Sequence, residues 1–175
     1  MTDQKLRKLV LAALFAALCT IMTMVIQVPS PVQGYVNLGD CAVLLAAWVL
    51  GPLHGGAAAG VGSMLADLLT GYAHYAPGTL VVKGLMALVA GWLFLRIKKG
   101  GLSRRLPALL ASGVTGELIM ILGYFIYEAA PVPVGLGLGA LSNVPFNLVQ
   151  GVFGLVAAGI LYLALERSHA LARLS

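Results

Sequence analysis

The sequence predicts an all-α, polytopic membrane protein with six transmembrane helices and with both termini in the cytoplasm. Of its 175 residues, 60% are hydrophobic and only 10% are charged, whereas soluble domains carry about 25% charged residues. Several apolar runs approach the ~20 residues that a helix needs to cross a bilayer, and they are too many for a signal peptide or a single anchor. We therefore expect one integral domain, residues 1–175, embedded in the lipid bilayer.

The six expected helices follow one another with short connections. They cover residues 5–26, 38–50, 54–70, 77–95, 106–127 and 140–165. Pro29 and Pro31 end the first helix, and Gly51-Pro52 ends the second, because proline cannot continue a regular helix. The second helix reaches only about 20 Å at 1.5 Å per residue. It must therefore be supported by its neighbours or end below the membrane surface.

The basic residues set the expected orientation. Ten of the eleven lysines and arginines fall before or at the start of the first helix, in the connection after the fourth, or in the tail: Lys5, Arg7, Lys8, Arg96, Lys98, Lys99, Arg104, Arg105, Arg167 and Arg173. An even number of spans places all of them on one side, which the positive-inside rule makes cytoplasmic. The net charge of +5 therefore reflects membrane topology, and no nucleic-acid partner is expected.

The three outer loops, residues 27–37, 71–76 and 128–139, contain no lysine or arginine. Their prolines and glycines interrupt helices, so they form either ordered caps or flexible lids.

Small residues recur at a spacing that lets helix backbones approach closely. Gly56 and Gly60 on the third helix favour internal packing. Ala12 and Ala16 on the first helix leave two alternatives open, internal packing or a surface for another membrane subunit. Cys19 and Cys41 lie in apolar surroundings and are expected to pack in the core.

The stretch from Asp67 to Lys83 joins a carboxylate in one apolar run to a lysine in the next through a polar, aromatic turn. Lys83 is the one basic residue outside the cytoplasmic set. Ionisable groups within spans usually face the bundle interior or an aqueous cavity. Lys83 therefore either forms a buried pair with Asp67 or Glu117, or contacts a ligand.

Two further acidic residues are candidates for the same region. Asp40 lies near the outer start of the second helix, where it serves either as a cap or first-turn residue or as part of a site. Glu117 lies near the middle of the fifth helix, and Tyr124 and Glu128 continue its face outward.

The sixth helix carries a polar stripe. Asn143, Asn147 and Gln150 recur at i, i+4 and i+7, which places them on one helical face. Asn143 can also be explained as a cap ahead of Pro145. Asn147 and Gln150 form either interhelical hydrogen bonds or ligand contacts.

These side chains converge on the outer half of the bundle and suit a small polar molecule with an aromatic ring, because amides and charges bind its edges and tyrosines stack on its face. The candidate substrate-binding residues are Asn37, Asp40, Asp67, Tyr72, His74, Tyr75, Lys83, Glu117, Tyr124, Asn143, Asn147 and Gln150.

Several motifs of catalysis are absent from the sequence. It contains no G-x-x-x-x-G-K-[ST] phosphate loop, no H-E-x-x-H and no G-x-S-x-G, and its cysteines and histidines do not have metal-ligand spacing. We expect no enzyme activity, cofactor or metal. Two rival classes remain open, an intramembrane enzyme acting on a lipid and a purely structural assembly subunit.

The sequence resembles the substrate-binding S components of energy-coupling factor (ECF) vitamin transporters. The resemblance rests on six spans in 175 residues, on Ala12-x-x-x-Ala16, and on YVNLGD from Tyr35 to Asp40, LGP from Leu50 to Pro52, GSMLAD from Gly62 to Asp67, Gly71-Tyr72 and Lys83-Gly84. It is greatest for the branch with riboflavin-, hydroxymethylpyrimidine- and pyridoxine-type members.

The resemblance implies a high-affinity subunit in the bacterial plasma membrane that captures a small vitamin or precursor. Such a subunit docks on a transmembrane T component with two ATPase subunits and topples to release its substrate inside. Ala12 and Ala16 would contact the T component, and the first and second outer loops would form part of the site and its gate. A pyridoxine- or hydroxymethylpyrimidine-like substrate is expected before riboflavin, with a modified purine base or lipoate as alternatives.

Overall fold

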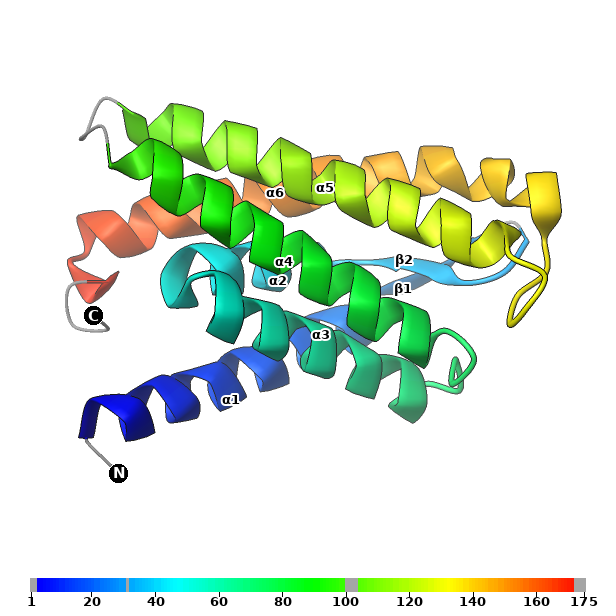
Figure 1. Ribbon diagram of the computed structural model, residues 1–175, viewed down its shortest axis with the longest axis horizontal. Coiled ribbons are helices and arrows are strands. Elements are labelled where there is room, and N and C mark those ends of the chain that lie inside the picture. The colour runs from blue at the N-terminus through cyan, green and yellow to red at the C-terminus, as the bar shows by residue number, and fades with distance from the viewer. Residues whose placement is uncertain (1–2, 31, 100–103, 172–175) are drawn as a thin grey trace.

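The computed structural model describes residues 3–30, 32–99 and 104–171, and these residues form a bundle of six α-helices (Figure 1). Pro31 and Arg173, used above, lie outside the described ranges. The elements are α1 (Asp3–Val25), β1 (Gln27–Pro29), β2 (Tyr35–Asn37), α2 (Gly39–Leu50), α3 (Pro52–Leu69), α4 (Ala76–Lys98), α5 (Arg105–Ala129), the 3-10 helix η2 (Gly137–Asn143) and α6 (Val144–Arg167). The predicted all-α fold is confirmed.

Each expected helix is present, with ends that differ by a few residues. The largest difference is at the last helix, where the run expected from residue 140 begins as η2 and becomes α6 at Val144. Pro145 lies in the first turn of α6, where its missing N–H would have no partner inside the helix. Residues 4–25, 76–98, 105–129 and 137–167 form helices long and apolar enough to cross a membrane. Six complete spans stay a prediction.

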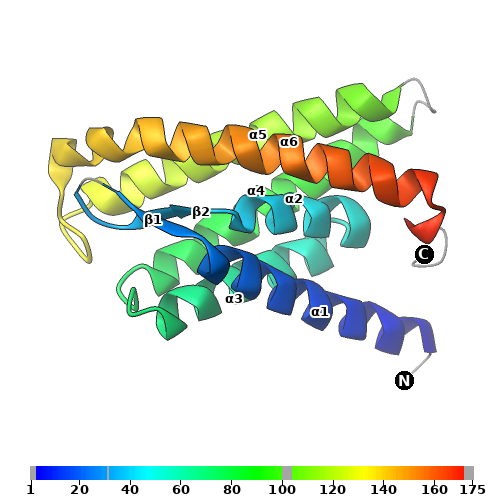
Figure 2. The ribbon, with the colours of Figure 1, turned by 180° about the vertical axis from the view of Figure 1, so that it is seen from behind.

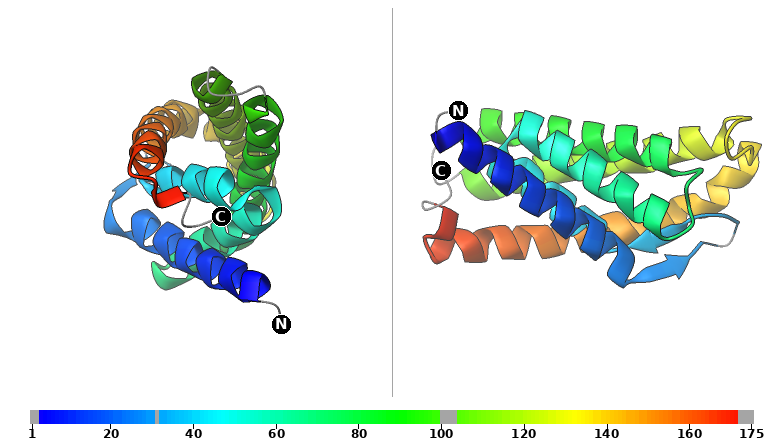
Figure 3. Two further views of the ribbon diagram at one scale, coloured as in Figure 1. Left: turned by 90° about the vertical axis from the view of Figure 1, so that its left-hand side faces the viewer. Right: turned by 90° about the horizontal axis from the view of Figure 1, so that it is seen from below.

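The short helix α2 lies in the centre of the bundle (Figure 3, left). It contacts α1, α3, α4 and α6, and all of its residues from Gly39 to Trp48 are buried. This packing explains how a helix of 12 residues is accommodated within the bundle. Of the two expectations for this segment, support by neighbouring helices is the one observed.

Close backbone contacts hold α3 against both of its neighbours. A Cβ atom added at Gly60 would lie 2.7 Å from the carbonyl oxygen of Leu80 on α4, and one added at Gly62 would collide with the carbonyl group of Ala16 on α1. The packing predicted for the glycines of this helix is therefore observed. Cys19 and Cys41 are free thiols in the core, as expected.

The outer surface of the bundle is apolar. Leu118, Leu122 and Phe153 are 50%, 57% and 65% exposed, as suits side chains that face lipid. Helix α1 crosses the others at an angle and separates from them toward its N-terminus (Figures 1 and 2).

The two ends of the bundle differ in chemistry. At one end α1 begins, α6 ends, and α4 ends close to the start of α5 (Figure 1). Arg96, Lys98, Arg105 and Arg167 lie in the terminal turns there. The β1–β2 hairpin, the α3–α4 connection and η2 lie at the other end. This separation supports the predicted orientation, although the cytoplasmic assignment stays a prediction.

Candidate functional site

A small polar cavity lies in the half of the bundle next to the β1–β2 hairpin. It is lined by Thr23, Ser30, Gly34, Tyr35, Asn37, Ser63, Asp67, Tyr75, Thr79, Lys83, Tyr124, Glu128, Asn147 and Gln150. Its volume is about 30 Å³, enough for about one or two water molecules, whereas pockets for small organic ligands usually measure about 300 Å³ or more. As described, the cavity is therefore too small to hold an organic ligand without expanding.

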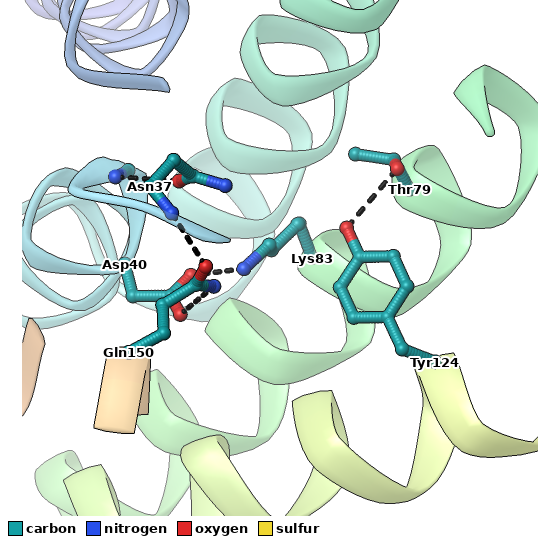
Figure 4. Close-up of polar contacts among 7 residues, drawn as sticks. Asn37, Asp40, Thr79, Lys83, Tyr124 and Gln150 are labelled. Carbon is teal, nitrogen blue, oxygen red and sulfur yellow. Dashed lines mark hydrogen bonds and ion pairs between the residues drawn. The ribbon is translucent and has the colours of Figure 1, made fainter. Parts of the chain in front are cut away.

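Lys83 forms a buried ion pair with Asp40. The lysine is 2% exposed and the aspartate 0%, and the ammonium group donates a hydrogen bond to Oδ1 of Asp40 (Figure 4). Of the two alternatives for Lys83, the buried pair was expected with Asp67 or Glu117, and those partners were wrong. The other alternative, a ligand contact, stays a prediction. The long lysine side chain on α4 reaches the first turn of α2 because α4 packs against α2, which spacing along the chain does not show.

Gln150 extends this pair into a network that joins three helices and β2. Its Nε2 donates to Oδ2 of Asp40 at 2.7 Å, and its Oε1 accepts a hydrogen bond from the backbone N–H of Asn37 at 2.7 Å (Figure 4). The side chain of Asn37 accepts a hydrogen bond from the N–H of Gly39 at 2.8 Å. Leu38 is the N-cap of α2 and no side chain caps it, so Asp40 is not the cap. It lies in the first turn, as the alternative expectation had it, and its side chain makes tertiary contacts.

A second group of polar contacts surrounds Glu128, which lines the cavity. Tyr75 donates a hydrogen bond to Oε1 of Glu128 at 3.3 Å. Asn143 donates to Oε2 of Glu128 at 3.0 Å and to the carbonyl oxygen of Gln33 at 2.9 Å. Asn143 occupies the N-cap position of α6 but makes no capping hydrogen bond. Its side chain instead connects α6 to α5 and to the hairpin loop.

Tyrosines form much of the remaining lining. Tyr35 donates to Oδ1 of Asp67 at 2.6 Å, and Tyr124 donates to the hydroxyl of Thr79 at 3.0 Å. The Lys83 ammonium lies 5.4 Å from the centre of the Tyr124 ring, within the range of a cation–π contact. Burial, reinforced by the charge of Asp67, raises the pKa of Tyr35. Burial and Glu128 raise the pKa of Tyr75. Both phenols therefore remain hydrogen-bond donors at neutral pH.

The structure brings most of the predicted site residues together. Asn37, Asp67, Tyr75, Lys83, Tyr124, Asn147 and Gln150 line the cavity, and Asp40 and Asn143 reach it through the hydrogen bonds described above. Tyr72 and His74 lie beside it, with the Tyr72 ring 4.6 Å from that of Tyr35 and the His74 ring 4.9 Å from that of Tyr75.

Glu117 is placed differently from the other candidates. It lines an apolar groove between α5 and α6 together with Leu118, Gly151 and Val152, and it does not line the polar cavity. Both carboxyl oxygens are buried without a hydrogen-bond partner among the described residues. Its proximity to Gly151 indicates that the small residue on α6 makes room for it.

Three hydroxyl side chains that were not predicted also line the cavity, those of Thr23, Ser63 and Thr79. Ser63 precedes Asp67 by four residues, and Thr79 precedes Lys83 by four, so each shares a helical face with a selected residue. That spacing was the available signal for both. Thr23 lies on α1 without such a neighbour, and nothing in the sequence marked it.

Packed helices with an apolar outer surface, four of them long and apolar enough to cross a membrane, are typical of an integral membrane protein. The sequence matches the family described as the ECF-type riboflavin transporter, S component, over residues 3–167. The chain belongs to this family. It is therefore a multi-pass membrane transport protein of the vitamin-transporter S component type and not an enzyme.

Two relatives align with most of the chain. An uncharacterized protein of Pyrococcus woesei is 40% identical over 141 residues, which cover 80% of this chain and 88% of that protein. The thiamine precursor transporter HmpT of Lactococcus lactis subsp. cremoris is 27% identical over 175 residues, which cover 96% of this chain and 93% of HmpT.

The fold also matches a solved structure, described as the S component of a bacterial ECF transporter. The TM-score is 0.67 at 17% sequence identity, with 93% of this chain and 97% of the other covered. At this identity the likeness concerns the fold alone.

Proposed function

We propose that this S component captures a small vitamin or vitamin precursor in its polar cavity and delivers it to a transmembrane T component energised by two ATPase subunits. The observation that carries the proposal is the cavity itself, where buried amides, charges and tyrosines converge at the end of the bundle opposite the basic residues. In the plasma membrane of a bacterial cell, this end would face outward.

The size of the cavity favours a small substrate. The cavity has a volume of about 30 Å³. It would have to expand less to hold a single-ring compound than to hold riboflavin, which has three rings. The relative HmpT is named as a thiamine precursor transporter, which is consistent with a single heteroaromatic ring. A pyridoxine- or hydroxymethylpyrimidine-like substrate is therefore proposed before riboflavin, a modified purine base or lipoate.

The hairpin and the α3–α4 connection form the gate of the proposed site. The hairpin consists of two strands of three residues, too few for independent stability. It is fixed by contacts with other elements, including Gln33 with Asn143 and Tyr35 with Asp67. Displacing it breaks hydrogen bonds with Thr70, Asp67, Asn143 and Gln150. Movement of the hairpin therefore disturbs residues that line the cavity, which couples the gate to ligand binding.

Docking on the T component is assigned to α1, with Ala12 and Ala16 as contact residues. Both are half-buried, and the backbone of Ala16 lies against Gly62 of α3. Leu14 on the outer face of α1 is 60% exposed. A helix of the T component would therefore pack along the α1–α3 seam and reach the two alanines from its edge.

The proposal is tested by binding and by uptake. Purified protein in lipid nanodiscs is titrated calorimetrically with hydroxymethylpyrimidine, pyridoxine and riboflavin, and native mass spectrometry identifies any molecule retained from the expression host. Uptake of the best ligand is then measured in cells with and without the T component and ATPase subunits. We expect the purified protein to bind its ligand tightly without any partner. Uptake should occur only in cells that also contain the T component and the ATPase subunits. A protein that retains no small molecule, binds none of the three and supports no uptake would contradict it.

A further inference from the structure

Three buried polar atoms on one side of the cavity lack a hydrogen-bond partner among the described residues. They are Oγ1 of Thr23, Oγ of Ser63 and Oδ2 of Asp67, and all three side chains line the cavity. Their exposed fractions are 4%, 0% and 3%. Buried polar groups in proteins are nearly always hydrogen-bonded, because a buried group without a partner costs free energy. A ligand that forms hydrogen bonds with these three atoms would remove that cost.

The chemistry of the three atoms specifies the edge of the ligand. Oδ1 of Asp67 already accepts a hydrogen bond from Tyr35. The Thr79 hydroxyl accepts a hydrogen bond from Tyr124 and also interacts with the Asp67 carboxylate, but no donor among the described residues has hydrogen-bond geometry to Oδ2. An ionised carboxylate only accepts hydrogen bonds. The ligand group opposite Oδ2 must therefore be a donor, such as an amino group.

The two hydroxyl groups add a second requirement. Ser63 lies one helical turn from Asp67 on the same face of α3, and Thr23 faces the same cavity from α1. Hydroxyl groups can donate as well as accept, so they match an acceptor located next to the amino group. A ring nitrogen adjacent to an amino-bearing carbon, as in an aminopyrimidine, presents this arrangement.

The charges around the cavity discriminate against anions. Lys83 is the one ammonium group in the described lining, and Asp40 already pairs with it. Asp67 and Glu128 contribute two further carboxyl groups to the lining. Because charges interact strongly where water is excluded, a phosphate or carboxylate on the ligand would be repelled without a free cation to compensate it.

From these observations we infer that the ligand is a neutral or positively charged aromatic heterocycle whose amino group binds Asp67 and whose adjacent ring nitrogen binds Ser63 or Thr23. This inference rests on the proposed function and narrows it. Hydroxymethylpyrimidine has the required edge, whereas pyridoxine lacks the amino group. Lipoate and phosphate esters carry the wrong charge.

A matched set of probes tests this assignment. Calorimetry on the purified chain compares 4-amino-5-hydroxymethyl-2-methylpyrimidine with the compound that has a 4-oxo group in place of the amino group, and with the phosphate ester of the amino compound. We expect the oxo compound to bind about tenfold to a hundredfold more weakly, as for a lost hydrogen bond to a charged group. The phosphate ester should show no measurable binding.

Two variants locate the preference in the protein. Asp67→Asn keeps the shape of the side chain and adds a donor, so it should weaken binding of the amino compound and reduce or reverse its advantage over the oxo compound. Ser63→Ala should weaken binding of both compounds by roughly threefold to tenfold. Glu166→Gln changes a carboxylate that pairs with Arg105 far from the cavity, and it should leave all affinities unchanged. Thermal unfolding verifies that each variant is folded.

The outcomes separate this inference from the proposed function. Equal binding of the amino and oxo compounds, tight binding of the phosphate ester, or an unchanged preference in folded Asp67→Asn would overturn the inference. If pyridoxine or riboflavin binds tightly and is transported while these probes do not bind, the proposed function stands and the inference falls. If Asp67→Asn does not fold, an unchanged affinity of both Ser63→Ala and Thr23→Val for the amino compound overturns the hydrogen-bonding assignment.

Discussion

Lys83 on α4 and Asp40 on α2 form an ion pair that is almost completely removed from solvent, with exposed fractions of 2% and 0%. Gln150 on α6 donates to the second oxygen of the same carboxylate. One buried aspartate thus connects three helices, and both of its partners line the cavity. Asp40 also forms the ion pair with Lys83, the lysine that the sequence suggested as a ligand contact.

Replacing Lys83 with methionine should destabilise the protein. A buried charge left without its partner costs about 3–5 kcal/mol, so we expect a large fall in the apparent Tm of Lys83→Met measured in detergent. The double variant Lys83→Met with Asp40→Asn removes both charges and should recover much of the loss. Arg105→Ala breaks a more exposed pair with Glu166 and should cost only about 0–1 kcal/mol. A double variant no more stable than Lys83→Met would contradict this account.

Gln150 and Asn147 should respond differently to substitution although both line the cavity. Gln150→Glu keeps the size of the side chain but replaces the amide that donates to Asp40 with a second carboxylate. We expect it to lower both the apparent Tm and ligand affinity. Asn147→Ala should weaken ligand binding with a smaller effect on Tm. Calorimetry and thermal unfolding on both variants check this contrast, and wild-type affinity in Asn147→Ala would remove that residue from the site.

The helix positions were predictable from the sequence because apolar runs and proline or glycine breaks carry that information locally. The site was predictable in part. Lys83, Tyr124 and Gln150 were selected because polar residues are conspicuous in apolar helices, and Tyr75 was selected because it belongs to the aromatic turn before Lys83. The pairing of Lys83 with Asp40 was not, since it depends on which helices become neighbours. Thr23 and Ser63 were missed because a single hydroxyl in an apolar helix commonly bonds to its own backbone, as Thr20 does to Ala16.

Glycines on different helix faces should differ in their tolerance of a methyl group. A Cβ at Gly60 would lie 2.7 Å from a backbone oxygen of α4, whereas one at Gly159 would meet nothing within 4 Å. Gly60→Ala should therefore force α3 and α4 apart and cost about 1–3 kcal/mol, as overpacking usually does. Gly159→Ala should be neutral or stabilising by up to about 1 kcal/mol. Thermal unfolding compares the two, and equal Tm values would show that the α3–α4 contact is not tight.

Bulky residues at Ala12 and Ala16 should separate transport from ligand binding. Neither side chain lines the cavity, so Ala12→Leu and Ala16→Leu should keep the affinity of the isolated protein. Small residues permit close helix approach in membranes, and the larger side chain would hold a T component helix away from α1. Uptake should fall to the level seen without the T component, and co-purification with the T component should be lost.

The matched control for this experiment is Ala111→Leu, which adds the same bulk at an exposed position on α5 and should leave uptake unchanged. Because Ala16 adjoins Gly62, Ala16→Leu also perturbs α3, so the comparison depends chiefly on Ala12→Leu. Normal uptake by Ala12→Leu in an intact complex would rule out docking at this edge of α1. If Ala13→Leu loses uptake while Ala12→Leu does not, the T component contacts the exposed face of α1 instead. Ala13 is exposed, whereas Ala12 is half-buried.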